Sequence, residues 1–134
     1  MRVILDTNVF VSGVFFSGPP FRILEAWRDR RLQLIASQEI LEEYQRVGET
    51  LAEQFPGVNL QPIIDLVTTN AEIFPNQVLP ESVCEDPDDD KFLACALISR
   101  CKMIVSGDRH LLKVSGFRGI KVVKPRQFIS EYLL

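Results

Sequence analysis

The sequence has few of the residues on which zinc sites, disulfide frameworks and membrane spans depend. Its single histidine, His110, has no histidine or cysteine partner at zinc-ligand spacing. Its three cysteines form no C-x-x-C pair, and this usage is typical of a reducing compartment. The apolar stretch at residues 9–16 is interrupted and much shorter than the roughly 20 residues of a membrane span. With no signal-peptide pattern either, we expect a cytoplasmic protein.

Two further features that the sequence lacks, a P-loop pattern and a positive net charge, argue against particular classes of function. The phosphate-binding pattern G-x-x-x-x-G-K-[ST] does not occur, so a P-loop nucleotide site is not expected. The net charge of −3 argues against a surface that binds nucleic acid throughout, although it leaves room for a basic patch beside an acidic site. The length of 134 residues and the hydrophobic fraction of 46% are ordinary for one globular domain, which we expect to span residues 1–134.

Short apolar runs alternate with amphipathic segments along the chain, and this alternation predicts an α/β fold. The continuous run from Val3 to Leu5 is typical of a strand covered on both faces. Strands separated by helices imply a parallel sheet with helices on both of its faces. The predicted strands are residues 3–5, 31–37, 102–108 and 119–124, and the predicted helices are residues 21–30, 38–51, 63–69, 88–100 and 125–134.

Two aspartates lie at the carboxyl ends of predicted strands. Asp6 comes after the first strand, and Asp108 follows the apolar run of the strand at residues 102–108. Ligands of open α/β sheets bind beyond the carboxyl ends of the strands, and these ends lie on one side of a parallel sheet. We therefore expect Asp6 and Asp108 to converge on one crevice.

Two helices are expected to direct further carboxylates toward the same side. With about 100° per residue, Glu43 lies on the flank of an apolar stripe, whereas Glu42 points to solvent. In the helix at residues 88–100, Asp90 lies one turn before the inward apolar residues, and Asp89 lies on the flank. A carboxylate at a helix start also serves as an ordinary cap, which is the structural alternative for Asp90.

Four carboxylates gathered in one crevice repel one another, and a divalent cation removes that conflict. Oxygen ligands of this kind suit Mg²⁺ or Mn²⁺. A calcium loop is excluded, because the D-x-D-x-D run that begins at Asp86 has Lys91 where the loop needs glycine and Leu97 where it needs glutamate.

Four segments together resemble the PIN-domain nucleases: "ILDTNVFVSG", "SQEILEEYQRV", "EDPDDDKFLACAL" and "IVSGDRHLL". The resemblance extends over essentially the whole chain and is nearest to the small bacterial and archaeal members classed as toxins of toxin–antitoxin pairs. It implies a Rossmann-like three-layer α/β/α sandwich with a central parallel sheet. It also implies an endoribonuclease that uses Mg²⁺ or Mn²⁺. The partners it allows are an RNA substrate, an antitoxin protein and a second copy of the chain.

The same resemblance assigns the site residues. It places the four metal-binding and catalytic acids at Asp6, Glu43, Asp90 and Asp108, with Asp89 and Glu39 as alternates. It places supporting polar groups at Thr7, Asn8 and Ser106, which orient ligands or waters.

Two other functions remain open. A haloacid-dehalogenase-like phosphohydrolase also has an aspartate after its first strand, but it requires D-x-D there, and this chain has Asn8. It further requires a lysine in the crevice, which the pattern does not locate. A nuclease-like fold that serves as a non-catalytic binding module is the second alternative.

Basic residues are concentrated near the C-terminus. No acidic residue occurs between Asp108 and Glu131, yet six basic ones do: Arg109, Lys113, Arg118, Lys121, Lys124 and Arg126. Because phosphate contacts supply most non-specific nucleic-acid affinity, we expect Arg109 and Lys113 to contact RNA. A solvated face, or a docking surface for an acidic antitoxin segment, is the alternative.

Overall fold

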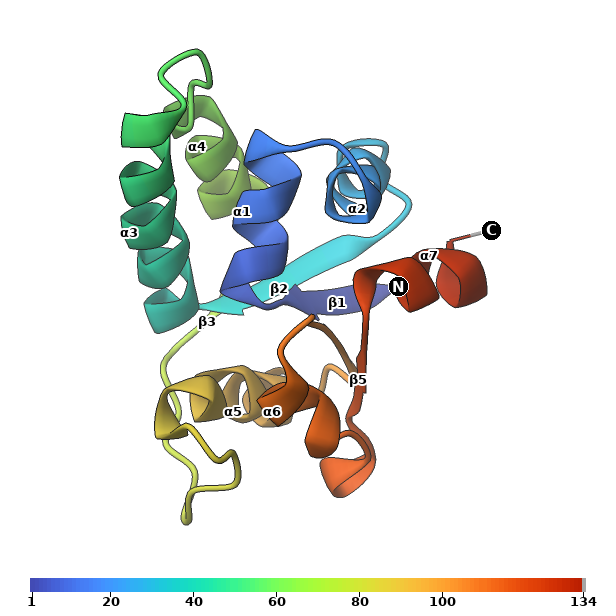
Figure 1. Cartoon of the computed structure of the whole chain (residues 1–134). Helices are drawn as coiled ribbons and strands as arrows, with labels where there is room; N and C mark the ends of the chain where they lie inside the picture. Colours follow the sequence, from blue (N-terminus) through green and yellow to red (C-terminus); the bar gives the residue numbers. More distant parts are fainter. Residues whose placement is uncertain (134) are drawn as a thin grey trace.

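The computed structural model describes residues 1–133 and contains a five-stranded, all-parallel sheet (Figure 1). The strand order is β3-β2-β1-β4-β5. The strands are β1 (Arg2–Leu5), β2 (Gln33–Ser37), β3 (Glu72–Phe74), β4 (Met103–Val105) and β5 (Lys121–Val123). The central strand β1 pairs with β2 on one side and with β4 on the other, where Leu5 lies opposite Val105. The predicted α/β fold with a parallel sheet is confirmed.

Helices cover both faces of the sheet (Figure 1). One face carries α1 (Thr7–Phe15), α2 (Pro19–Arg28), α3 (Gln38–Gln54) and α4 (Gln61–Asn70), and α7 (Pro125–Tyr132) packs beside α2. The opposite face carries α5 (Asp90–Ser99) and α6 (Arg109–Lys113). Two short 3₁₀ turns, η1 (Pro87–Asp89) and η2 (Phe117–Gly119), complete the order. None of the helices within residues 1–133 has the length and apolarity that crossing a bilayer requires.

The carboxyl end of β1 is anchored in the core. The side chains of residues 3–5 are fully buried, as expected for a central strand. Tyr44 of α3 donates its hydroxyl to the Leu5 carbonyl at 2.5 Å and stacks on Phe10 of α1, with 4.2 Å between ring centroids. These contacts fix α1 and α3 to the point where β1 ends, so the residue that follows β1 has a rigid mount.

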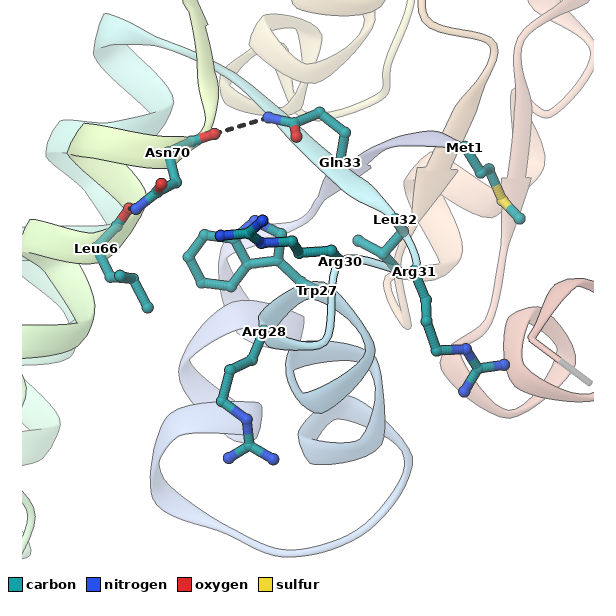
Figure 2. A pocket seen from close by; sticks show the side chains of 9 residues that line it. All are labelled: Met1, Trp27, Arg28, Arg30, Arg31, Leu32, Gln33, Leu66 and Asn70. Atoms are coloured by element: carbon teal, nitrogen blue, oxygen red, sulfur yellow. Dashed lines mark hydrogen bonds between the residues drawn. The ribbon is translucent and has the colours of Figure 1, made fainter.

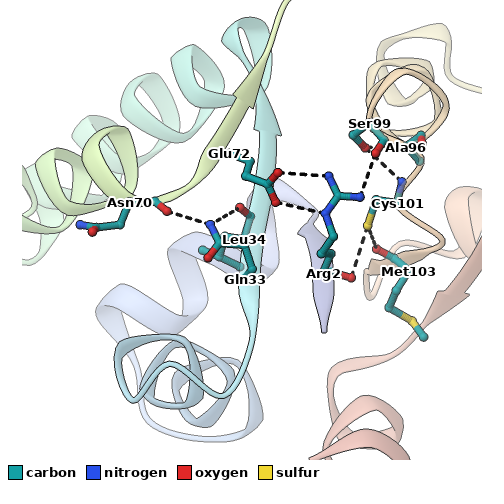
Figure 3. Close-up of polar contacts among 9 residues, drawn as sticks. All are labelled: Arg2, Gln33, Leu34, Asn70, Glu72, Ala96, Ser99, Cys101 and Met103. Carbon is teal, nitrogen blue, oxygen red and sulfur yellow. Dashed lines mark hydrogen bonds and ion pairs between the residues drawn. The ribbon is translucent and has the colours of Figure 1, made fainter.

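The amino ends of the strands are tied by a separate polar network (Figure 3). Arg2 donates to the Glu72 carboxylate of β3 at 3.1 Å and to the Ser99 carbonyl at the end of α5 at 2.8 Å. Cys101 contacts the Arg2 carbonyl through its thiol at 3.3 Å. All three cysteines are buried and free, so they serve as small packing groups.

Two α-helices and one strand of the structure were not among the predicted ones: α1, α6 and β3. The sequence of α1 is apolar on nearly all sides because the helix is largely buried, so it lacks the amphipathic period that marks a helix. Strand β3 has only three residues, and α6 only five. Elements this short leave little periodicity in a sequence.

Candidate metal centre

The sheet has its topological switch point between β1 and β4. From β1 the chain proceeds outward to β2 and β3, and it then returns to place β4 on the other side of β1. Asp6 directly follows β1, and Asp108 lies three residues after the end of β4. The two aspartates therefore meet at the carboxyl edge where α/β proteins bind ligands.

Asp6 is buried and held by its neighbours. Its side chain is largely inaccessible, and its Oδ2 accepts a hydrogen bond from Ser106 Oγ at 2.6 Å. Burial raises the pKa of Asp6, and the nearby carboxylates of Asp108 and Glu43 raise it further, against the lowering effect of hydrogen bonds from Ser106 and Thr7. A buried carboxyl with carboxylate neighbours is a group whose ionised form a cation stabilises.

Asp108, Asp89 and His110 form a compact group of potential metal ligands. One ligand atom from each residue lies within 4.8 Å of the other two. Asp108 also caps α6, because its Oδ1 accepts a hydrogen bond from the His110 amide at 2.7 Å, and its own amide donates to Ser106 Oγ at 2.9 Å. Ser106 therefore bonds to both strand-end aspartates.

Asp89 joins this group from the turn η1. Burial raises the pKa of its carboxyl to about 6, and the charges of Asp108 and Asp6 contribute to the rise. Its Oδ2 is buried and has no hydrogen-bond partner among residues 1–133. A buried carboxylate oxygen without a donor is costly, and a cation is one partner that would satisfy it.

Asp90 is engaged elsewhere. Its carboxylate accepts hydrogen bonds from Ser82 Oγ at 2.8 Å and from the Cys84 amide at 2.7 Å, with the Val83 amide at 3.2 Å. Burial tends to raise the pKa of Asp90, but these hydrogen bonds outweigh it and the net shift is downward. Asp90 thus holds residues 82–84 against the start of α5, and the geometry favours the alternate, Asp89, as the third metal-binding acid.

Glu43 projects from α3 toward α5 and forms an ion pair with Lys91 through its Oε2. The two side chains are only 15% and 10% exposed, respectively. Burial tends to lower the pKa of Lys91, but its hydrogen bonds and charge interactions with Glu43 and Asp88 raise it overall. Lys91 was not among the predicted site residues, although it is the only basic residue within the acidic run at residues 85–91.

The other predicted site residues differ in how far they are exposed to solvent. Thr7 is buried, and its Oγ1 has no hydrogen-bond partner in the described part of the chain, whereas Asn8 is exposed. Glu39 is half-buried and lines a pocket of about 460 Å³ together with Glu43, Asp90 and Lys91. Glu42 is exposed, as its helical phase predicted.

The basic residues near the C-terminus do not form one surface. Arg109 and Lys113 are exposed on α6, directly after Asp108, and Lys113 lies 3.8 Å from Glu85 Oε2. Lys121 instead begins β5 and therefore lies at the amino edge of the sheet. Arg109 and Lys113 therefore lie near the acidic residues, and Lys121 does not.

A second pocket, of about 450 Å³, lies at the amino edge (Figure 2). Trp27 and three arginines line it, but two of these arginines are already engaged. Arg31 donates to the Leu133 carbonyl at 2.6 Å, and Arg28 lies within 3.6 Å of the carboxylates of Glu25 and Asp29. This pocket is remote from the strand-end aspartates, because Met1 and Gln33 line it and β1 and β2 begin there.

The carboxyl-edge residues fit a divalent metal ion. The group of Asp89, Asp108 and His110 offers oxygen and nitrogen ligands, and the buried Oδ2 of Asp89 has no donor among the described residues. Asp6 adds a buried carboxyl whose pKa is raised. These features describe a centre that could bind a metal.

The fold is that of a known class of protein, the PIN domains. The family model for the PIN domain matches residues 2–110, and the chain belongs to this family, which is part of a nuclease superfamily. The chain is also similar to an uncharacterized protein of Methanocaldococcus jannaschii, MJ1680. The two are 28% identical over 144 residues, which cover 98% of this chain and 92% of the archaeal protein.

Proposed function

We propose that the protein is an endoribonuclease that hydrolyses phosphodiester bonds with a bound Mg²⁺ or Mn²⁺ ion. The observation that carries this proposal is the group of Asp89, Asp108 and His110, which lies beside the buried Asp6 at the switch point of a PIN-domain sheet. The unpartnered Oδ2 of Asp89 supports a cation at that place.

The residues that would hold the ion are Asp89 and Asp108, with Asp6 adjacent to them. When bound, a divalent ion neutralises charge that develops on the phosphate and makes a water molecule a better nucleophile. Ser106 Oγ donates a hydrogen bond to the Asp6 carboxylate and accepts one from the Asp108 amide. These two hydrogen bonds keep Asp6 and Asp108 in fixed positions before substrate arrives, as efficient catalysis requires.

The proposal is tested with labelled single-stranded RNA and the matching DNA. Purified protein should cleave RNA when Mn²⁺ or Mg²⁺ is supplied, and EDTA should stop the reaction. Asp6→Asn is the inactive control, and Glu42→Gln, which alters an exposed carboxylate next to Glu43, is the active one. A purified wild-type protein that binds the ion yet leaves RNA and DNA intact would contradict the nuclease proposal.

We further propose the finer role of a toxin with an antitoxin partner, which rests on the sequence resemblance. Induced expression should arrest growth for the wild-type chain and not for Asp6→Asn, provided that both accumulate to equal levels. Growth that continues at equal protein levels would contradict the toxin role while leaving the nuclease proposal in place.

A phosphohydrolase is the second candidate, because the structure supplies a feature that this class requires. Lys91 lies beside Glu43 in the crevice with little of its side chain exposed, and such a lysine was not evident from the sequence pattern. Position 8 is nevertheless an exposed asparagine, not the second aspartate of D-x-D. Hydrolysis of p-nitrophenyl phosphate without RNA cleavage would favour the phosphohydrolase.

A further inference from the structure

The ion pair between Glu43 and Lys91 lies on the side of the acidic crevice where α3 approaches α5. Lys91 belongs to the first turn of α5, and its ammonium has a second acceptor in the Asp88 carbonyl at 2.9 Å. The Asp88 carboxylate lies 3.3 Å away on the solvent side. The ammonium thus has three oxygen neighbours, and the Lys91 side chain is only 10% exposed.

The charges in the crevice divide into two groups. Glu43 has a cation of its own in Lys91, whereas no lysine or arginine within residues 1–133 forms an ion pair with Asp6, Asp89 or Asp108. The group that a metal ion would neutralise is therefore the strand-end group with Asp89. The Glu43 carboxylate is neutralised by the protein itself.

A second divalent ion would compete with this ammonium. Ions of two-metal hydrolytic sites lie about 4 Å apart and share carboxylates, so a second ion would have to draw on Glu43. It would then lie within a few ångströms of the Lys91 ammonium, whose positive charge would repel it. The Lys91 ammonium already pairs with the carboxylate that such an ion would need.

We propose that this centre binds one divalent ion, and that the Lys91 ammonium holds Glu43 where a second ion would otherwise bind. The inference rests on the metal centre of the proposed function and adds its stoichiometry. Lys91 is a positioning residue, because it acts through Glu43 and leaves the strand-end acids to the ion.

The first test counts bound ions without any RNA. Calorimetric titration of metal-free protein with Mn²⁺ should give one site, and electron paramagnetic resonance should show no coupled Mn²⁺ pair. Asp89→Asn and Asp108→Asn should each weaken binding at least tenfold, and Glu43→Gln less than threefold. Two ions in the wild-type protein, or a loss in Glu43→Gln as large as in Asp108→Asn, would overturn the inference.

The second test replaces the ammonium. Lys91→Met keeps most of the apolar stem and frees Glu43, so it should gain a second Mn²⁺ site, which Glu43→Gln should remove again. Lys91→Arg should remain at one ion because it retains the charge. Lys91→Gln serves in place of Lys91→Met if circular dichroism shows that the latter is unfolded. A neutral variant that is folded and still binds one ion with wild-type affinity would show that Lys91 is only a structural contact.

These outcomes separate the inference from the proposed function. If the wild-type protein binds no Mn²⁺ at all, the metal centre and its stoichiometry both fail. If it binds two ions and cleaves RNA, the nuclease proposal stands and the role of Lys91 is wrong. A structural ion pair alone would change thermal stability in Lys91→Met without changing the number of ions.

Discussion

Ser106 Oγ donates a hydrogen bond to Asp6 Oδ2 at 2.6 Å, across a sequence separation of 100 residues. The same oxygen accepts the amide proton of Asp108 at 2.9 Å. One hydroxyl therefore links the residue after β1 to the segment after β4, at the edge where the sheet reverses its order. The link holds the Asp6 carboxyl beside the backbone of Asp108, whose carboxylate contributes to the raised pKa of Asp6.

Asp6→Asn should abolish metal-dependent cleavage while the fold remains intact. The amide oxygen can still accept the Ser106 proton, and the change removes a charge from a buried site where the pKa of Asp6 is already raised. We expect activity to fall on the order of 100-fold or more, with a melting temperature that is unchanged or higher. Wild-type turnover by the folded variant would exclude Asp6 from the metal centre.

Asp89 and Asp90 should separate metal affinity from stability. Asp89→Asn should weaken Mn²⁺ binding and stabilise the metal-free protein, because it removes a buried charge without a donor. Asp90→Ala should leave affinity nearly unchanged and cost about 1–2 kcal/mol through the lost hydrogen bonds to residues 82–84. Calorimetry and urea unfolding of both variants provide the comparison. A larger affinity loss at Asp90 would restore the assignment that the sequence favoured.

The sequence was sufficient to place Asp6 and Asp108, because strand ends in a parallel sheet fall on one edge whatever the details of packing. Between Asp89 and Asp90, the sequence favoured Asp90 on the basis of a helical projection. The helical projection assumes one regular helix, but Asp89 ends the turn η1 and Asp90 begins α5, so their directions are set by different local geometry. The hydrogen bonds that engage Asp90 come from residues 82–84, which carry no regular pattern.

The role of Lys91 was likewise beyond a sequence argument. Its position on α5 could be assigned, but its partner Glu43 lies on α3, and the pairing depends on how these two helices meet. Periodicity describes each helix alone, whereas contacts between helices depend on side-chain packing in three dimensions. The inward direction of the half-buried Glu43 could be predicted from the sequence, because its own helix has a clear apolar stripe.

The stability of the metal-free protein should fall as the pH rises from about 4 to about 6. Asp89 has a pKa of about 6 when folded against an ordinary value of 3.8, so the folded state holds its proton more tightly. Its contribution to stability is complete below the ordinary value and is lost as the pH rises through about 6. Urea unfolding in EDTA should show this fall, and Asp89→Asn should reduce it. Equal pH dependence in both proteins would contradict the assignment to Asp89.

Divalent metal should raise thermal stability, because only the folded chain assembles the acids. At Mn²⁺ one hundred times above its dissociation constant, we expect the melting temperature to rise by about 10 °C. The rise should vanish in the double variant Asp89→Asn, Asp108→Asn and persist in Glu42→Gln, whose side chain is exposed. The same rise in the double variant would place the metal elsewhere in the protein.

An acidic protein that binds RNA needs basic side chains near its site to contact the polyanion. Arg109 and Lys113 are exposed on α6, which begins directly after Asp108, so they are the basic residues best placed to meet RNA at the crevice. Changing both to glutamate should weaken RNA binding about tenfold at low salt and flatten its salt dependence, because fewer counterions are released. Mn²⁺ affinity should change little, since both side chains point into solvent.

The matched control for this pair is Lys102→Glu with Lys121→Glu. Lys102 directly precedes β4 and Lys121 begins β5, so this pair reverses the same amount of charge at the amino edge of the sheet. Binding is measured by fluorescence anisotropy with labelled RNA over a salt series. If the two double variants lose affinity equally, the effect reflects net charge alone. An unchanged affinity in the α6 variant would mean that these two residues contact something other than RNA.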